Sequence, residues 1–514
     1  MAPIAQVSER TFYPALLKVI SEKGGSGVTE IQYNSVPDIE FDYIGQRWLL
    51  SVKIGESPSL MKDAFVQYLR HKEESGLEYG LLLVLPESAR KAKAREDSVL
   101  AAVHGTTVAV LIDAGPVKDE YRDRTFGEIL DLLRIQVAPL IAQKIAKHYP
   151  LPLVISFLRA QVLDVMSKLT LSEEAILRII TDRALLSDLG SLTKQEVEDV
   201  ARFLAAYIIL SQILFLRLFA VVHPEALPGH GPINRTRLRQ AFKRVLDINY
   251  RPIFELNVLD VVADEYLRDT FDLIWGLEVE RAQYELPGRI FHELMPPRIR
   301  KLLAAFYTRP QAAEILARLT VKQSDDPASG SGTILVSAYR AKQRLHGLER
   351  KPGNPHKRFC EHGIFGADIM PFAVHLTSAN LAAMDVGETI ERTQIIQGDS
   401  IELVAGTAYK GSLQLSLFGA PRKAKTTAGD EYDVTLEAVD VTLMNPPFTK
   451  VERRIKDYVN MVRFKELAGG EVGLWGHFIF LANEFLREGG IYGAVLPINI
   501  LRGREKRAGT ELSI

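Results

Sequence analysis

The sequence predicts an α/β protein in which a helical region separates two α/β regions. Three observations lead to this prediction. Strand-like and helix-like runs alternate over residues 1–118, and long amphipathic or apolar helical patterns fill residues 119–285. Over residues 286–514, short buried strands again alternate with helices, and acidic residues follow several of these strands. Such alternation is typical of a parallel sheet covered by helices.

Composition narrows the class of protein. A length of 514 residues predicts about three domains. The net charge of −1 argues against a generally basic nucleic-acid coat but leaves room for local basic grooves. The single cysteine, Cys360, excludes an internal disulfide and a cysteine-rich zinc site, which fits a reducing cytoplasm. The polar start Met1–Glu9, with no apolar segment after it, predicts no secretory signal.

The first α/β region is expected to contain a hairpin between two helices. Ile44-Gly45-Gln46 lies between two β-like runs, which is a hairpin signal. A buried apolar run follows the second helix. The predicted helices are Glu9–Lys23 and Ser59–Gly76, and the predicted strands are Asp38–Tyr43, Arg47–Lys53, Tyr79–Leu85 and Val108–Ile112.

Polar residues of this hairpin resemble a nuclease motif. Pro37-Asp38, Asp42 and Ser51-Val52-Lys53 are similar to the Pro-Asp…(Asp/Glu)-x-Lys arrangement, in which two acids hold Mg²⁺ and a lysine assists attack by water on phosphate. The resemblance implies a nuclease-like fold with a metal site at Asp42 and Lys53. Ser51 stands in the place of the second acid, so cleavage would need a substitute carboxylate. The candidates are Glu30, Glu40 and Glu56. Hairpin residues without chemistry are the simpler alternative.

The helical region contains one stretch that is apolar enough to enter a membrane, Phe203–Val222. It includes Gln212 and Arg217, and inserting a central arginine costs about 2.5–3.5 kcal/mol. We therefore predict a buried bundle helix and no membrane contact. Thr193 and Glu196 form a capping-box signal at its start. The predicted helices are Phe126–Lys147, Leu151–Ser167, Ser172–Leu186, Lys194–Val222 and Arg235–Leu246.

In the second α/β region, the apolar run 439–444 ends at Asn445-Pro446-Pro447-Phe448. Proline fixes its own φ and restricts the residue before it, so this turn is stiff. Its carbonyl oxygens and the Asn445 amide suit a planar exocyclic amino group, and Phe448 can stack on the attached ring. The bland alternative is a simple turn after a strand.

Three acids upstream follow other predicted strands. Asp326 begins Asp-Pro-Ala-Ser-Gly-Ser-Gly, a loop whose glycines let backbone N–H groups of the next helix approach a ligand. Asp368 ends the run 363–367 and is placed to hold ribose hydroxyls in a nucleotide site. Asp399 follows the run 394–397. Each acid alone is more commonly a turn or cap residue, but the ordered set indicates a nucleotide-type site.

Together these motifs resemble the S-adenosylmethionine-dependent DNA amino-methyltransferases of type I modification subunits and type IIG enzymes. The loop 326–332 is similar to the family's Asp-Pro-Ala-Cys-Gly-Ser-Gly, with Ser329 replacing cysteine. The run 306–310 is similar to Phe-Tyr-Thr-Pro, with Arg309 inserted. The resemblance covers about residues 286–514 and has the motif order of the γ class. It implies a Rossmann-like methyltransferase sheet, preceded by a helical domain that contacts DNA, contacts a partner subunit or serves as scaffold.

The resemblance also implies site residues and a reaction. The implied catalytic residues are Asn445, Pro446, Pro447 and Phe448, and the implied cofactor-binding residues are Tyr307, Thr308, Asp326, Ala328, Gly330, Gly332, Asp368 and Asp399. The implied reaction is methyl transfer to adenine N6 in double-stranded DNA, within a restriction–modification or phage-defence system that can include specificity or restriction subunits. The alternatives are a cytosine-N4, RNA or protein-glutamine methyltransferase, or a noncatalytic component of a defence complex.

Five strands of this sheet are predicted, around 320–325, 363–367, 394–397, 439–444 and 490–496. A methyltransferase sheet of this type has two more strands and is usually followed by a target-recognition domain. We therefore expect the chain to be a fragment or a truncated gene product.

Overall fold

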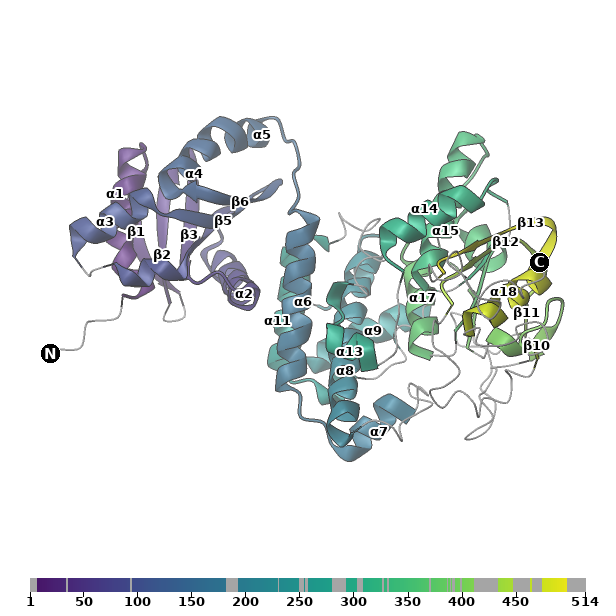
Figure 1. Cartoon of the computed structure of the whole chain (residues 1–514). Coiled ribbons are helices and arrows are strands. Elements are labelled where there is room, and N and C mark those ends of the chain that lie inside the picture. The colour runs from purple at the N-terminus through teal and green to yellow at the C-terminus, as the bar shows by residue number, and fades with distance from the viewer. Residues whose placement is uncertain are drawn as a thin grey trace, which may run out of the picture. The chain divides into compact units, whose positions relative to one another are not determined.

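A computed structural model describes most of the chain (Figure 1). The described residues are 7–33, 36–92, 95–181, 193–229, 231–248, 254, 258–279, 293–302, 308–325, 328–330, 332–368, 371–385, 387–388, 390, 393–397, 400–410, 433–446, 463–464 and 474–496. The chain divides into two compact units, one formed by residues 1–167 with 265–282 and the other by residues 168–264 with 283–514.

The first unit is built on a six-stranded sheet in which the strands follow chain order. The β3–β4 pair is parallel, because α2 crosses over between these two strands, and every other neighbouring pair is antiparallel. The four predicted strands are confirmed, and β1 and β6 are additional. The strands are β1 (Ser26–Tyr33), β2 (Val36–Tyr43), β3 (Gln46–Ile54), β4 (Tyr79–Leu85), β5 (Thr107–Ala114) and β6 (Val117–Thr125).

Alternation along β2 and β3 gives this sheet two different faces. Ile39, Phe41, Trp48 and Leu50 are buried in a core shared with α1 (Tyr13–Glu22), α3 (Glu96–Gly105) and α4 (Phe126–Leu132). The residues between them, including Asp38 and Ser51, point to the other face. There α2 (Pro58–Ser75) covers β3 and β4.

The N-terminal sheet extends beyond residue 118, the expected domain boundary, since that residue lies within β6. The expected helix 126–147 is divided into α4, a π turn at Leu133–Val137 and α5 (Ala138–Ala142). Pro139 lacks a backbone N–H and cannot continue the regular helix ladder, which accounts for the interruption. Helix α6 (Leu151–Lys168) and most of α11 (Asp264–Gly276) also belong to the first unit, in place of a single helical domain 119–285.

The long apolar helix of the second unit is α8 (Lys194–Ala220). Its predicted capping box is confirmed, because Thr193 Oγ1 accepts from the Glu196 amide and Glu196 accepts from the Thr193 amide. The helix is long and apolar enough to cross a membrane, but 89% of its apolar window is buried within the protein. It is therefore packed as a core helix. Three helices of this unit contact it: α7 (Glu173–Thr181), α9 (Arg235–Ile248) and α13 (Pro297–Leu302).

The second unit contains a five-stranded sheet of order β13-β12-β7-β8-β9, in which all neighbouring pairs are parallel. Five strands were predicted, but the first lies at β7 and not at 320–325. Residues 322–325 are polar and form a turn that side-chain ion pairs hold. The strands are β7 (Ala328–Gly330), β8 (Ile364–Asp368), β9 (Gln394–Gln397), β12 (Val439–Met444) and β13 (Leu486–Ala494).

Helices cover both faces of this sheet. On one face, α14 (Pro310–Thr320) and α15 (Gly332–Leu348) pack on Val441 and Leu443 of β12. On the other, α18 (Leu474–Phe485) packs near Val439 and Phe365. The unit is completed by α16 (His356–Arg358), α17 (Pro371–Ala382) and the two-stranded pair β10 (Ala408–Lys410) and β11 (Asp433–Thr435). A helix–sheet–helix sandwich of parallel strands places loops at one edge, where the strands end.

Candidate functional site

Three predicted site residues lie at the carboxyl ends of three neighbouring strands. Ser329 of β7 is in register with Thr442 of β12 and with Phe365 of β8. Asn445, Gly332 and Asp368 each lie three residues beyond this row, since 445 − 442, 332 − 329 and 368 − 365 all equal 3. The parallel register therefore brings them to the same edge of the sheet. This is where open α/β sheets bind ligands.

Glycines allow these strands to approach closely. A Cβ atom at Gly330 would lie 2.3 Å from the Leu443 carbonyl oxygen, a contact that no real side chain makes. A Cβ at Gly366 would lie 2.7 Å from Leu335 Cδ1 and 3.1 Å from the Gly330 carbonyl oxygen. Glycine at 330 is thus required by the β7–β12 contact. The chain then enters α15 at Gly332, so the amino end of a helix lies at the same sheet edge.

Asn445 follows β12 directly, and a backbone hydrogen bond fixes the position of the residue before it. The Val495 amide donates to the Met444 carbonyl over 2.9 Å, which extends the β12–β13 ladder to the residue before Asn445. The Asn445 Oδ1 atom is buried, and Pro446 is buried as well. The side-chain amide is therefore placed at a defined point of the sheet edge. Pro447 and Phe448 lie outside the described residues.

The structure describes only some of the remaining residues that were predicted to bind the cofactor. Thr308 is buried with 7% exposure, just before α14. Ala328 lies on β7. Tyr307, Asp326 and Asp399 lie outside the described residues, so their roles stay predictions. Arg309, the insertion noted in the sequence, occupies the N-cap position of α14, whose first residue is Pro310, and its side chain makes no capping hydrogen bond.

An ion cluster precedes the loop that begins at Asp326, and sequence reasoning did not identify it. The Lys351 ammonium donates to Ser324 Oγ over 2.9 Å and to Asp325 Oδ2 over 2.6 Å. Arg358 also pairs with Asp325. The pKa of Asp325 is lowered mainly by its hydrogen bond from Lys351, and the pKa of Glu349 is lowered to about 2 by Lys351 and Ser324. The polar run 322–325 was the only sequence signal.

The hairpin of the first unit does not bring Asp42 and Lys53 together. Asp42 is in register with Arg47, and its Oδ2 accepts from Arg47 Nη1 over 3.0 Å. Lys53 lies six residues farther along β3, which is about 20 Å at 3.3 Å per residue. Its Nζ lies 4.0 Å from Glu9 Oε1. The expected pairing required the two residues to be opposed across the hairpin, and the register opposes Asp42 to Arg47.

Asp38, the acid of the Pro-Asp pair, makes different contacts. Its Oδ1 accepts from Ser51 Oγ over 2.7 Å, and its Oδ2 contacts His71 Nδ1. The exposures of Asp38, Ser51 and His71 are 2%, 3% and 3%. Within the described part of the chain, no group of three histidine, cysteine or acidic side chains could hold a metal ion. These residues do not fit a Mg²⁺ site. The sequence signal for His71 was only its place on the helix after the hairpin.

Comparison with known proteins gives a family match in the C-terminal part of the chain. Residues 297–510 match the sequence model of a family described as N-6 DNA Methylase. No curated protein sequence matches the chain. Similar solved structures are the type IIG restriction endonuclease BpuSI (12% identity, TM-score 0.40, 97% of this chain and 52% of that one), a type I R-M system (15%, 0.37, 67% and 64%) and a DrdV–DNA complex (11%, 0.36, 94% and 49%).

The chain thus spans about half the length of the BpuSI chain. All three TM-scores are below 0.5, so the family assignment depends on the sequence match. That match includes the strands whose ends carry Gly332, Asp368 and Asn445. Residues 297–510 of this chain are therefore similar to the N-6 DNA methylases.

Proposed function

We propose that this protein transfers a methyl group from S-adenosylmethionine to the exocyclic N6 of adenine in DNA. The supporting observation is the row of Gly332, Asp368 and Asn445 at the ends of β7, β8 and β12, within the region that matches the N-6 DNA methylases. One edge of a parallel sheet then holds both a cofactor carboxylate and the amide that binds the target amine.

The residues of this edge fit the cofactor. S-adenosylmethionine, when bound, supplies an electrophilic methyl group on a positively charged sulfur. Gly330 and Gly332 leave room for the backbone to approach it at the start of α15. Asp368 holds the ribose hydroxyls, as strand-end acids do in nucleotide sites. In the same proposal, Asp326 borders the loop, Asp399 contacts the adenine ring, and Tyr307 and Thr308 lie against the methionine end.

Asn445 and Pro446 prepare the amine. A base inside a duplex is out of reach, so the target adenine is flipped out of the helix and stacks on Phe448. Asn445 Oδ1 and the Pro446 carbonyl accept the two amino hydrogens. These bonds draw the nitrogen toward a tetrahedral geometry and free its lone pair. Because a buried, backbone-anchored amide needs no reorganisation, it stabilises the developing positive charge effectively.

The transfer itself is a single displacement. The N6 lone pair forms the new N–C bond as the C–S bond breaks, and the electron pair of that bond stays on sulfur. The methylated nitrogen then loses one proton to water, which restores the neutral amine. Holding the two reacting atoms in line is the main contribution of the site.

Double-stranded DNA is the proposed macromolecular substrate, in a cytoplasmic restriction–modification or phage-defence system. The support is the family, whose name specifies DNA. Specificity or restriction subunits are the proposed partners.

The test compares Asn445→Ala with Asn483→Ala, an exposed asparagine on α18. Transfer of labelled methyl to DNA should fall about 10²–10³-fold for Asn445→Ala, because the acceptor of the amino hydrogens is lost. Asn483→Ala should match the wild type. Affinity for S-adenosylhomocysteine, measured by calorimetry, should be unchanged in both. Wild-type transfer rates in Asn445→Ala would contradict the assignment.

The product decides between the substrate classes. Mass spectrometry of digested product should identify N6-methyladenine. N4-methylcytosine, methylated RNA or methylglutamine would identify one of the other acceptors. If the wild type binds cofactor but transfers no methyl group even with partner subunits present, the noncatalytic alternative is favoured.

A further inference from the structure

The Asp38 carboxylate of the first unit is occupied by protein partners on both oxygens. Ser51 donates to Oδ1, and His71 of α2 contacts Oδ2. A serine hydroxyl that donates to a carboxylate presents no negative charge to a cation. Mg²⁺ prefers six oxygen ligands, several of them water, at about 2.0–2.1 Å. A cluster whose members are at most 3% exposed has no water-facing side for such a shell.

The other polar residues of the hairpin are also engaged. Arg47 pairs with both Asp42 and Glu40. Glu9 lies beside the Lys53 ammonium. None of these pairs includes Asp38 itself, although burial and the nearby carboxylates of Asp38, Glu9 and Glu30 together raise the pKa of Tyr13. Cleavage of phosphate by a metal-bound water needs a second carboxylate and a lysine near one cation.

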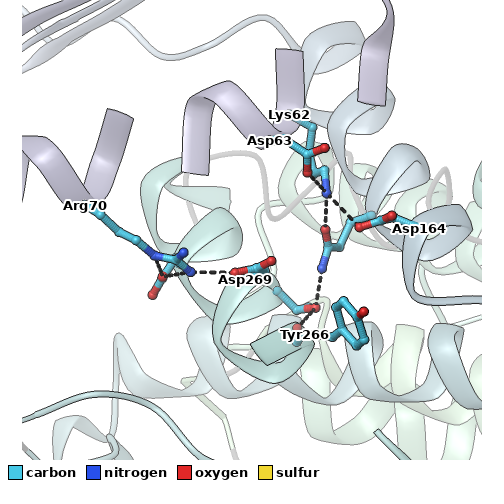
Figure 2. Close-up of polar contacts among 9 residues, drawn as sticks. Lys62, Asp63, Arg70, Asp164, Tyr266 and Asp269 are labelled. Carbon is cyan, nitrogen blue, oxygen red and sulfur yellow. Dashed lines mark hydrogen bonds and ion pairs between the residues drawn. The ribbon is translucent and has the colours of Figure 1, made fainter. Parts of the chain in front are cut away.

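What Asp38 does instead follows from His71. This residue belongs to α2, so its contact with Asp38 fastens the helix to β2. The same helix carries Lys62 and Arg70, which pair with Asp164 of α6 and with Asp269 of α11, respectively (Figure 2). The helix thus has polar contacts in both directions.

The contacts with α6 and α11 are extensive. The Lys62 ammonium is fully buried and donates to Gln161 Oε1 over 2.9 Å and to Asp164 Oδ2 over 3.2 Å. Gln161 in turn donates to Thr270 Oγ1 over 2.8 Å. Arg70 donates to Asp272 through Nε and Nη2, over 2.9 and 2.8 Å, and pairs with Asp269. These groups join residues some 100 to 200 positions apart in the sequence.

We infer that Asp38 is a structural anchor for α2 and that the Asp38–Ser51 position holds no divalent cation. The N-terminal sheet then serves as a platform on which α2 docks α6 and α11, and it does not cleave DNA through a Mg²⁺ ion at the hairpin. This inference does not depend on the proposed methyl transfer, since none of its residues lies in the second unit.

The test measures Mn²⁺ binding to the full chain by electron paramagnetic resonance, with Mn²⁺ as a visible substitute for Mg²⁺. Three proteins are compared: the wild type, Asp38→Asn and Ser51→Asp. The wild type and Asp38→Asn should bind Mn²⁺ equally weakly. Ser51→Asp places a second carboxylate beside Asp38, but the enclosed position leaves no side for the water ligands of a cation, so its Mn²⁺ affinity should match that of the wild type.

A Mn²⁺ site that is present in the wild type and lost in Asp38→Asn would overturn the inference. This comparison is decisive even if Ser51→Asp does not fold. The urea unfolding midpoint and the circular dichroism spectrum serve as the folding control, because Asp38 and Ser51 both lie in the first unit and its unfolding must be followed directly. A Mn²⁺ affinity at least about tenfold higher in a folded Ser51→Asp protein would also count against it, since the position would then accept the water ligands of a cation.

Discussion

The two sheets of this protein both carry acidic residues, but they use them differently. In the first unit, Asp38 lies within a strand pair and is enclosed by Ser51 and His71. In the second, Asp368 ends β8, half-buried, at the edge where β7 and β12 also end. A carboxylate within a covered face can satisfy itself only with protein partners. One at the end of a parallel strand borders a loop edge and can meet a ligand.

This difference shows that a sequence motif alone does not determine whether its residues form a ligand site. Pro-Asp followed by Ser-x-Lys resembles a metal site in the sequence, yet α2 and Ser51 complete the hydrogen bonds of Asp38. Asp326 through Asn445 resembles a cofactor and amine site, and the register of three strands brings its described members to one edge. Whether a carboxylate can bind a ligand therefore depends on which protein groups already form hydrogen bonds with it in the folded chain.

The largest effect is expected from removing the buried positive charge of Lys62 on α2. Lys62→Met leaves Asp164 and Gln161 without the ammonium, and breaking a buried pair on one side costs about 3–5 kcal/mol. Urea unfolding should show this loss, while the affinity for S-adenosylhomocysteine should not change. Lys18→Met, at an exposed position of α1, is the matched control. If cofactor affinity falls together with stability, the two units are not separate in function.

The second prediction concerns the effect of low pH on the stability of the second unit. His356 is fully buried against the Tyr339 hydroxyl, 2.7 Å away, and burial lowers the pKa of His356 to about 4. The unfolded chain takes up this proton near pH 6.5 and the folded chain only near pH 4. Stability is therefore complete above pH 6.5 and declines by about 3 kcal/mol as the pH falls to 4.

The measurement is the free energy of unfolding against pH, by urea titration and circular dichroism. His356→Gln should flatten the profile over this range. His362→Gln, at an exposed position a few residues later, should leave the profile as in the wild type. An unchanged slope in His356→Gln would show that other groups carry the acid sensitivity.

The smallest expected effect tests the strand-end carboxylate. Asp368→Ala should weaken binding of S-adenosylhomocysteine about 10- to 100-fold, or 1.4–2.8 kcal/mol, because hydrogen bonds from hydroxyls to a charged acceptor are lost. Asp440→Ala is the control: this acid lies near the start of β12 and pairs with Arg487 at the surface. Calorimetry should separate the two variants. Equal affinities would place the cofactor elsewhere.

Part of the fold could be predicted from the sequence because local rules decide it. The strands at 363–367, 394–397 and 439–444 are apolar runs bounded by turn residues, and the structure places strands there. The capping box at Thr193 and Glu196 is likewise local. The first strand of the second sheet was misplaced because its run is short and because Lys351 and Arg358, distant in sequence, hold the polar turn before it.

The order of the acids and the Asn-Pro-Pro-Phe turn were enough to predict a nucleotide-type site and its target amine. Stiff turns and strand ends can be predicted because residues close together in the sequence determine them. Only the tertiary structure decided which carboxylates are enclosed by protein partners and which lie at a strand end. Hydrogen bonds such as Asp38 with His71, or Lys62 with Asp164, join residues far apart in the chain, and no local pattern encodes them. Strand register likewise emerges from packing, and it aligned Asn445 with Asp368 and separated Asp42 from Lys53.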